Sequence, residues 1–279
     1  MIDKIYKYPV VLTIAGSDSG GGAGIQADLK TFSALGCFGT SAITAVTVQN
    51  TLGVSAIHSI PPEIVAGQIK AVLDDIKPDA IKIGMVHSAE LAVAIASVLK
   101  DHPAIPVIFD PVMVATSGDK LIENGTIDCL KQVLFPLAVL VTPNLDEAVL
   151  LAEMSINNVE DMEIAADRIL SFGCEAVLVK GGHLKGKQLF DVYLDKSGRK
   201  QIFESEAIDT NNTHGTGCSL SSAIAAFTAR KLDLIPAIAE AKIYIHQAIE
   251  SGKDVKTGAG NGPLDHFFNP EKLIKYELE

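Results

Sequence analysis

The sequence has no tryptophan and very few arginines, and the second shortage excludes one class of protein. Its 279 residues include 34 acidic and 23 basic side chains, which gives a formal charge of −11. The only arginines are Arg168, Arg199 and Arg230, and no cluster of basic residues appears. A nucleic-acid-binding surface needs such a cluster, so we expect no nucleic-acid partner. An anionic ligand would have to be bound by backbone N–H groups, single lysines or a metal ion.

Long hydrophobic runs and paired cysteines are missing as well. The longest apolar stretch, around 133–141, contains Pro136 and is too short to cross a bilayer, so we expect no membrane association. The cysteines are widely spaced and form no C-x-x-C pair: Cys37, Cys129, Cys174 and Cys218. This spacing argues against a disulfide scaffold or a thiolate metal site. It favours a cytoplasmic enzyme whose thiols are reduced.

Short apolar runs alternate with longer amphipathic segments along the whole chain. Hydrophobic residues make up 48% of the sequence, which is enough for a large core. The alternation is typical of βαβ units around a mostly parallel sheet. We predict strands over 9–15, 41–48, 80–84, 107–110, 138–142 and 176–180. We predict helices over 25–35, 62–76, 89–99, 127–135, 146–154, 161–172, 217–230 and 235–250.

Two later segments, 189–194 and 201–207, alternate apolar and polar residues on either side of the turn 196–199. They predict an antiparallel hairpin at one edge of the sheet. No repeat or long linker interrupts the chain, so we predict one domain over 1–279. Its fold class is α/β, with a doubly wound, mostly parallel central sheet and helices on both faces. Ligands of such sheets bind beyond the carboxyl ends of the strands.

Two glycine-rich segments match nucleotide-binding motifs only in part. Residues 22–27 fit the loose dinucleotide fingerprint, but Gln49 and Asn50 stand where an acidic residue would bind a ribose hydroxyl. Residues 181–187 read as a P-loop, except that Gln188 replaces the required serine or threonine. We interpret the second match as a coincidence. A dinucleotide-dependent oxidoreductase remains an alternative that the first match leaves open.

The segment 210–218, T-N-N-T-H-G-T-G-C, is the sharpest motif and precedes a predicted helix. Its glycines allow a ligand to approach the first N–H groups of that helix. Such groups form an anion hole suited to a transferring phosphoryl group. Cys218 lies in the first turn, where the helix dipole is expected to lower the pKa of its thiol, so that it could act as a base or nucleophile. An inert, buried cysteine is the competing interpretation.

Charged residues stand where three predicted strands end. Asn144 and Glu147 fit a helix capping box. Glu147 could instead orient waters around Mg²⁺, which commonly takes only one or two carboxylates. Asp110 could help to hold that metal, and Lys180 could reach the phosphates of a nucleotide. Each of these two residues could also simply cap its strand.

Together these motifs resemble the ribokinase superfamily, whose members transfer the γ-phosphoryl group of ATP to small hydroxyl compounds. The segment 144–147 is similar to the magnesium motif of that superfamily, and 215–218 is similar to its anion hole. Cysteine in place of the usual aspartate base is similar to the branch of vitamin kinases. Further segments resemble the hydroxymethylpyrimidine/phosphomethylpyrimidine kinase family of thiamine biosynthesis: 15–18, 21–32, 48–51, 82–85 and 180–183.

This resemblance implies two successive phosphorylations by ATP with Mg²⁺, from hydroxymethylpyrimidine to its monophosphate and then to the diphosphate. It implies that Gln49 pairs with a ring nitrogen and the exocyclic amine of the pyrimidine, because its amide offers a donor and an acceptor. It places Asp28 and the backbone of Ala23 beside the hydroxymethyl group or the ring. Met85 and Val112 would sandwich the flat heterocycle.

The resemblance also assigns the catalytic, nucleotide and metal sites. Cys218 would take the proton of the alcohol, and the N–H groups of 215–218 would stabilise the transferring phosphoryl group. The resemblance assigns Gly215, Thr216 and Gly217 to the anion hole. It assigns Lys180, Asn144 and Thr213 to the binding of ATP, and Glu147 and Asp110 to the binding of Mg²⁺.

Two alternatives remain open beside this prediction. A pyridoxine or pyridoxal kinase of the same branch, or an enzyme with both specificities, would use the same ATP and Mg²⁺ machinery. The segment 49–51, Q-N-T, favours the pyrimidine. A non-catalytic pyrimidine-binding relative is the other alternative, against which Lys180, Glu147 and Cys218 together argue. The resemblance further implies a homodimer.

Overall fold

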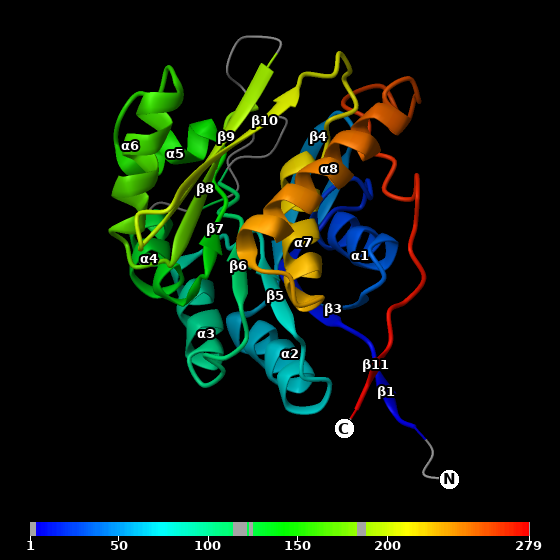
Figure 1. The fold of residues 1–279 in the computed structure, drawn as a ribbon. Helices are drawn as coiled ribbons and strands as arrows, with labels where there is room; N and C mark the ends of the chain where they lie inside the picture. The colour runs from blue at the N-terminus through cyan, green and yellow to red at the C-terminus, as the bar shows by residue number, and fades with distance from the viewer. Residues whose placement is uncertain (1–3, 114–121, 123–124, 183–187, 279) are drawn as a thin grey trace.

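A mixed β-sheet runs through the centre of the molecule, with helices on both faces (Figure 1). The computed structural model describes residues 4–113, 122, 125–182 and 188–278. Within these residues, nine strands form the sheet in the order β10-β9-β8-β7-β6-β5-β2-β3-β4. Its strands are β2 (Val10–Ser17), β3 (Phe38–Asn50), β4 (Gly53–Ser59), β5 (Ala80–Ile83), β6 (Val107–Phe109), β7 (Leu140–Val141), β8 (Ala176–Lys180), β9 (Gln188–Asp195) and β10 (Lys200–Glu206).

The interior strands β3, β2, β5, β6, β7 and β8 are parallel to one another, and both edges of the sheet are antiparallel. Strand β5 is buried along its whole length, as expected for a parallel strand that is covered on both faces. The mostly parallel α/β sheet and the edge hairpin of β9 and β10 are therefore confirmed.

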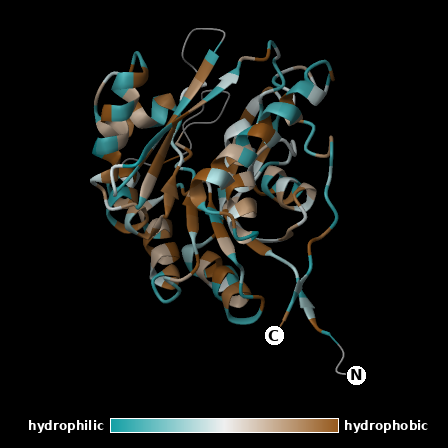
Figure 2. Cartoon of the chain, viewed as in Figure 1, coloured by the Kyte–Doolittle hydropathy of each residue, from teal (hydrophilic) through white to brown (hydrophobic). Residues whose placement is uncertain are grey.

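The helices cover the two faces of the sheet in two groups, which Figure 1 shows on opposite sides of the strands. One group is α2 (Pro62–Asp75), α3 (Ala89–Leu99), α4 (Thr126–Val133), α5 (Leu145–Ala152) and α6 (Val159–Leu170). The other group is α1 (Gly24–Ala34), α7 (Thr216–Ala229) and α8 (Leu234–Gly252). The hydrophobic residues concentrate on the central strands and on the helix sides that face them (Figure 2).

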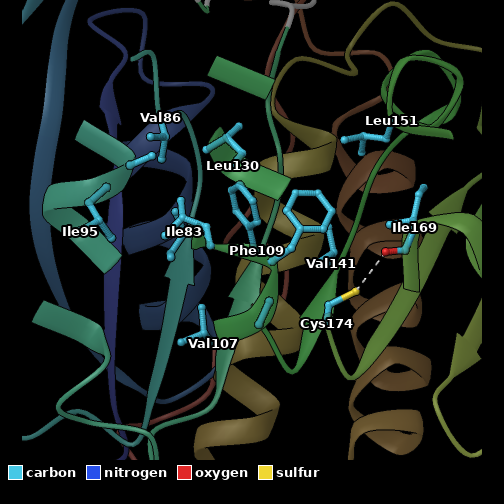
Figure 3. Close-up of a cluster of buried hydrophobic side chains, with 14 of the residues drawn as sticks. Ile83, Val86, Ile95, Val107, Phe109, Leu130, Val141, Leu151, Ile169 and Cys174 are labelled. Atoms are coloured by element: carbon cyan, nitrogen blue, oxygen red, sulfur yellow. Dashed lines mark hydrogen bonds between the residues drawn. The ribbon is translucent and has the colours of Figure 1, made fainter. Parts of the chain in front are cut away.

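Each face of the sheet carries its own buried core. Figure 3 shows part of the first, in which the Phe109 and Phe135 rings meet edge to face with centroids 5.6 Å apart. Cys174 belongs to this core, and burial raises the pKa of its thiol to about 12. The second core packs Phe32 of α1 and Phe227 of α7 against the opposite face. These cores fix the strand ends from which the candidate site is built.

Two strand pairs were not predicted. Strand β4 pairs antiparallel with β3, which extends to Asn50 and so places Gln49 within a strand. Most of β4 is exposed, so it lacks the alternation of buried and exposed residues that predicts a strand. The short strands β1 (Tyr6–Lys7) and β11 (Tyr276–Glu277) pair across almost the whole chain, and no local pattern could reveal such a pairing.

Helix ends differ from the prediction where polar side chains or proline set them. Helix α6 begins at Val159 because the Asn158 side chain accepts the Asp161 N–H at 2.8 Å. Helix α4 ends at Val133, and Pro136 lies in a short 3₁₀ turn that follows. Among the residues that the structure describes, no helix combines the length and apolar character needed to cross a membrane.

Candidate active site

A cavity of about 730 Å³ opens at the carboxyl ends of the parallel strands. It lies between the loops that follow β2, β5, β6 and β7 and the beginning of α7. The predicted site residues that line it are Ala23, Gln49, Met85, Asp110, Val112, Asn144, Glu147, Lys180, Thr213, Gly215, Thr216, Gly217 and Cys218. The cavity thus brings together residues that are almost 200 positions apart in the sequence.

The loop between β2 and α1 is folded around the carboxylate of Asp18. That carboxylate accepts N–H groups from Gly20, Gly22 and Ala23 at 2.7, 3.1 and 2.9 Å. His214 Nε2 contacts it at 2.9 Å and so ties the loop to the start of α7. Burial opposes ionisation of Asp18, but the hydrogen bonds from His214 and the backbone lower its pKa overall.

The beginning of α7 fits against this loop because glycine stands at two positions. Gly215 has φ = +83°, and a Cβ there would overlap the carbonyl oxygen of Gly22. A Cβ on Gly217 would lie 3.2 Å from Lys180 Nζ. Glycine therefore lets both the loop and the ammonium group approach the first turn of the helix.

One of the N–H groups assigned to the anion hole, that of Thr216, is hydrogen-bonded within the chain. Thr216 donates both its N–H, at 3.2 Å, and its hydroxyl, at 2.8 Å, to the carbonyl oxygen of Thr213. The N–H groups of Gly217 and Cys218 follow in the first turn, where a helix has no carbonyl acceptor of its own. These two groups are donors available to an anion at this helix end.

Cys218 does not have the lowered pKa that the helix dipole predicts. Burial raises the pKa of its thiol to about 11, although the ammonium of Lys82 acts in the opposite direction. The prediction is wrong because loss of hydration outweighs the favourable charges near the thiol. In the ligand-free site the thiol is therefore protonated at neutral pH.

A pair of buried charges lies beside the start of α7. Lys180 Nζ donates to Asp110 Oδ1 at 2.8 Å, and the Thr142 hydroxyl donates to the same oxygen at 3.1 Å. Burial alone would raise the pKa of Asp110, but Lys180 and Lys82 lower it below the ordinary value. Asp110 is thus a carboxylate, and Lys180 is an ammonium held next to Gly217.

Asp28 is the one predicted site residue that lies behind the cavity wall. Its carboxylate is fully buried and accepts hydrogen bonds from Thr13 at 2.6 Å, Lys82 at 2.9 Å and Ser222 at 2.7 Å. With these donors around it, Asp28 faces no substrate directly. Lys82 lines the cavity in its place, and sequence reasoning missed it. The signal was a lysine within the apolar strand β5.

The capping box at Asn144 and Glu147 is confirmed. The Asn144 side chain accepts the Glu147 N–H at 2.9 Å, and Glu147 Oε2 accepts the Asn144 N–H at 2.8 Å. Burial raises the pKa of Glu147 to about 7; Lys180 lowers it and Asp110 raises it. Glu147 is therefore partly ionised at neutral pH, and its negative charge adds to the Asp110–Lys180 pair, which is neutral as a whole.

This excess of carboxylate charge fits a hard divalent cation such as Mg²⁺. Among the described residues, no group of three or more His, Cys, Asp or Glu side chains gathers as a metal cluster. A bound Mg²⁺ would accordingly have Glu147 and Asp110 near it and would keep waters and substrate phosphates as its other ligands.

Three residues that the resemblance assigns to the pyrimidine, Gln49, Met85 and Val112, line the cavity. Gln49 lies with its Nε2 3.4 Å from His214 Nε2 and its Oε1 3.0 Å from the Thr47 hydroxyl. Met85 and Val112 line the cavity here, and a Cβ on Gly16 would approach the Met85 methyl to 2.7 Å. His214 is a second residue to which sequence reasoning gave no role, although it lies in the predicted motif.

The phosphomethylpyrimidine kinase family matches residues 18–265 of the chain. The chain belongs to this family. It is 49% identical, over 259 residues, to the hydroxymethylpyrimidine/phosphomethylpyrimidine kinase of Rhizobium meliloti; the match covers 92% of this chain and 97% of the relative. The fold has ribokinase-like neighbours among solved structures.

Two of these structures frame the comparison. A phosphomethylpyrimidine kinase from Clostridium difficile is 43% identical, with a TM-score of 0.76 and coverage of 86% of this chain and 99% of that one. A pyridoxal kinase from Staphylococcus aureus, in complex with AMP-PCP and pyridoxal, is 32% identical, with a TM-score of 0.85 and coverage of 98% and 100%.

Replacing Glu147 with Gln removes the negative charge of the side chain and keeps its capping hydrogen bond. The amide keeps an acceptor for the Asn144 N–H, so we expect the helix to remain capped. The pKa of Glu147 is raised by folding, so its charge destabilises the native state at pH 8. We therefore expect the free energy of unfolding of Glu147→Gln to exceed that of the wild type by about 3 kcal/mol at pH 8, a gain that vanishes below pH 4.

The same variant should need a higher Mg²⁺ concentration for half-maximal kinase activity. Chemical denaturation and a magnesium titration measure the two effects. Unchanged magnesium dependence would contradict the placement of the cation near Glu147.

Replacing Gly217 with Ala should weaken phosphoryl transfer through the displacement of Lys180. The new Cβ would lie 3.2 Å from Lys180 Nζ, which is closer than usual, so the ammonium must shift. We expect kcat to fall by about tenfold, which is less than the roughly 10²–10³-fold for complete loss of one anion-stabilising donor. Gly67→Ala is the matched control, because Gly67 is also helical and a Cβ there would meet open space. Equal kinetics for the two variants would show that the approach of Lys180 is unimportant.

Proposed function

We propose that this protein transfers the γ-phosphoryl group of ATP to 4-amino-5-hydroxymethyl-2-methylpyrimidine and then to the resulting monophosphate, in thiamine biosynthesis. The observation that carries the proposal is the position of Cys218. It stands at the anion-binding end of α7, in one cavity with Gln49 on the substrate side and Lys180 on the phosphate side. The family match and the names of the relatives support this assignment.

In the first step, the alcohol of the substrate must lose a proton as it attacks. The thiolate of Cys218 accepts that proton, the alcohol oxygen bonds to the γ-phosphorus, and the bond from phosphorus to the ADP oxygen breaks. The N–H groups of Gly217 and Cys218 stabilise the charge on the transferring group. Gln49 orients the ring, while Met85 and Val112 hold its two faces.

ATP would be bound at the other end of the cavity by Lys180, with Asn144 and Thr213 as further contacts. Lys180 is the buried ammonium next to the anion hole, which suits it to the γ-phosphate. When bound near Glu147 and Asp110, Mg²⁺ would neutralise phosphate charge. The ATP-analogue complex of the Staphylococcus aureus relative supports nucleotide binding in this fold.

A pyridoxine or pyridoxal kinase activity is the second candidate. The likeness to the Staphylococcus aureus pyridoxal kinase, with a TM-score of 0.85, favours it as a side activity. Gln49 favours the pyrimidine, because its amide matches a ring nitrogen beside an exocyclic amine.

We also propose that the enzyme is a cytoplasmic homodimer. Four free cysteines are compatible with a reducing compartment. Val48 and Leu52 of the β3–β4 edge are exposed apolar residues of the kind that a second copy would cover. Light scattering on the purified protein tests the dimer, and a monomer at micromolar concentration would contradict it.

The proposed activity is tested by following ATP consumption with Mg²⁺ and three separate acceptors. We expect turnover with hydroxymethylpyrimidine and with its monophosphate, and slower turnover with pyridoxine. Turnover of pyridoxine alone would indicate a pyridoxine kinase of vitamin B6 salvage. No turnover with any of the three would favour a pyrimidine-binding protein without catalysis.

Replacing Cys218 with Ala should affect the two steps unequally. The alcohol needs a base, whereas the monophosphate is already ionised at neutral pH. We expect kcat to fall by about 10²–10⁴-fold for hydroxymethylpyrimidine and by far less for the monophosphate. Equal losses in both steps would make the role of the cysteine positional.

The two steps should also differ in their pH dependence. Because the pKa of the Cys218 thiol is about 11, the thiolate fraction rises tenfold per pH unit below that value. We expect log kcat/KM for the alcohol to rise from pH 6.5 to 9, while the value for the monophosphate stays level above pH 7. A plateau for the alcohol at neutral pH would contradict a base with this pKa.

A further inference from the structure

Lys82 and Asp28 form an ion pair in the interior, directly behind the site. Both side chains have no exposed surface, and Lys82 Nζ lies 2.9 and 3.0 Å from the two carboxylate oxygens. Thr13 and Ser222 donate two further hydrogen bonds to Asp28. Burial alone would lower the pKa of Lys82, but Asp28 raises it above the ordinary value, so the lysine is charged.

This pair lies next to Cys218. Ser222, which donates to Asp28, follows Cys218 by one helical turn and so shares its face of α7. Lys82 borders the same cavity as Cys218, and its positive charge favours the thiolate form of Cys218. The ammonium of Lys82 therefore acts on the thiol of a residue in the first turn of α7.

Stability does not explain why an ion pair occupies this position. Desolvation of two charges consumes most of their attraction, and well-packed apolar residues of similar size are often equally stable. The rest of β5 consists of alanine and isoleucine, so the strand could have carried an apolar residue here. We therefore look for a chemical role that requires a positive charge at Lys82.

We propose that Lys82 is a positioning residue for the first phosphorylation: its ammonium, held in place by Asp28, stabilises the Cys218 thiolate that accepts the proton of the substrate alcohol. The inference rests on the proposed function, because it needs Cys218 to act as the base. The thiolate takes the proton from the alcohol, the oxygen bonds to the γ-phosphorus, and ADP leaves. The thiol then returns its proton to solvent.

The other charges near Cys218 determine whether each substitution should favour or oppose its thiolate form. Lys82 and Lys180 favour the thiolate, whereas Asp28 and Asp110 oppose it. Removal of Lys82 alone should therefore leave the thiolate facing uncompensated carboxylates. Removal of Lys82 together with the charge of Asp28 should disturb it less, because the effects of the two losses oppose each other.

The test measures the acidity of Cys218 without requiring catalysis. Iodoacetamide alkylation of Cys218 is followed by peptide mass spectrometry from pH 7 to 10 in wild type, Lys82→Met and Asp28→Asn/Lys82→Met. The control is Lys7→Met, which removes the lysine of a Lys–Asp pair (3.1 Å to Asp79) that precedes β2 and β5, at the opposite end of the sheet.

We expect alkylation at pH 8 to be about tenfold slower in Lys82→Met, which corresponds to one pKa unit. The double variant should be slowed less, and Lys7→Met should match wild type. Wild-type alkylation rates in both Lys82 variants would overturn the proposal. If Lys82→Met fails to fold, which its melting curve reveals, the charge-balanced double variant still decides, since the proposal requires it to be slower than wild type.

Kinetic measurements with both acceptors distinguish a failure of the role of Lys82 from a failure of the proposed function. In folded variants we expect kcat for hydroxymethylpyrimidine to fall by about the same tenfold, with the rate for the monophosphate little changed. Equal losses for both acceptors would reduce Lys82 to a structural role. If wild type phosphorylates neither acceptor, the proposed function fails, while the alkylation rates still report on the charge of Lys82.

Discussion

The site depends on a row of buried charges of alternating sign beneath the start of α7. Asp28 pairs with Lys82, and Asp110 pairs with Lys180, while Glu147 adds a fifth charge at the end of the row. Each group is buried and would cost free energy alone, but each is flanked by opposite charge. The row ends with one carboxylate in excess, whose charge a bound Mg²⁺ would offset. The fold therefore supplies most of the electrostatic environment of a phosphoryl transfer before any ligand binds.

This row fits beneath α7 because the residues of the helix that face it are small. The serines of α7 turn toward the charges: Ser221 donates to Asp110 at 3.3 Å and Ser222 to Asp28 at 2.7 Å. Small residues let this helix lie close to the sheet, and the positive φ of Gly215 closes it against the loop that Asp18 shapes. The two hydrophobic cores then hold the strand ends from which the charges project.

The sequence was sufficient for the parts of the structure that local chemistry determines. The apolar strands, the edge hairpin and the Asn144 capping box follow from patterns within a few residues of each other. The exposed strand β4 and the closing pair of β1 and β11 do not, since their pairing depends on distant segments. The burial of individual polar side chains could likewise not be predicted from the sequence. Asp28 resembles a ligand contact until its carboxylate is seen against Lys82, and the thiol of Cys218 resembles an acidic one until its loss of hydration is considered.

A crystal structure of the protein with Mg²⁺, AMP-PCP and hydroxymethylpyrimidine bound together would locate the reacting groups. We expect the γ-phosphate at the N–H groups of Gly217 and Cys218, beside Lys180 Nζ. We also expect the substrate hydroxyl within hydrogen-bonding distance of Cys218 Sγ and the ring edge on Gln49. A γ-phosphate bound away from the start of α7, or a hydroxyl group turned away from Cys218, would contradict this arrangement.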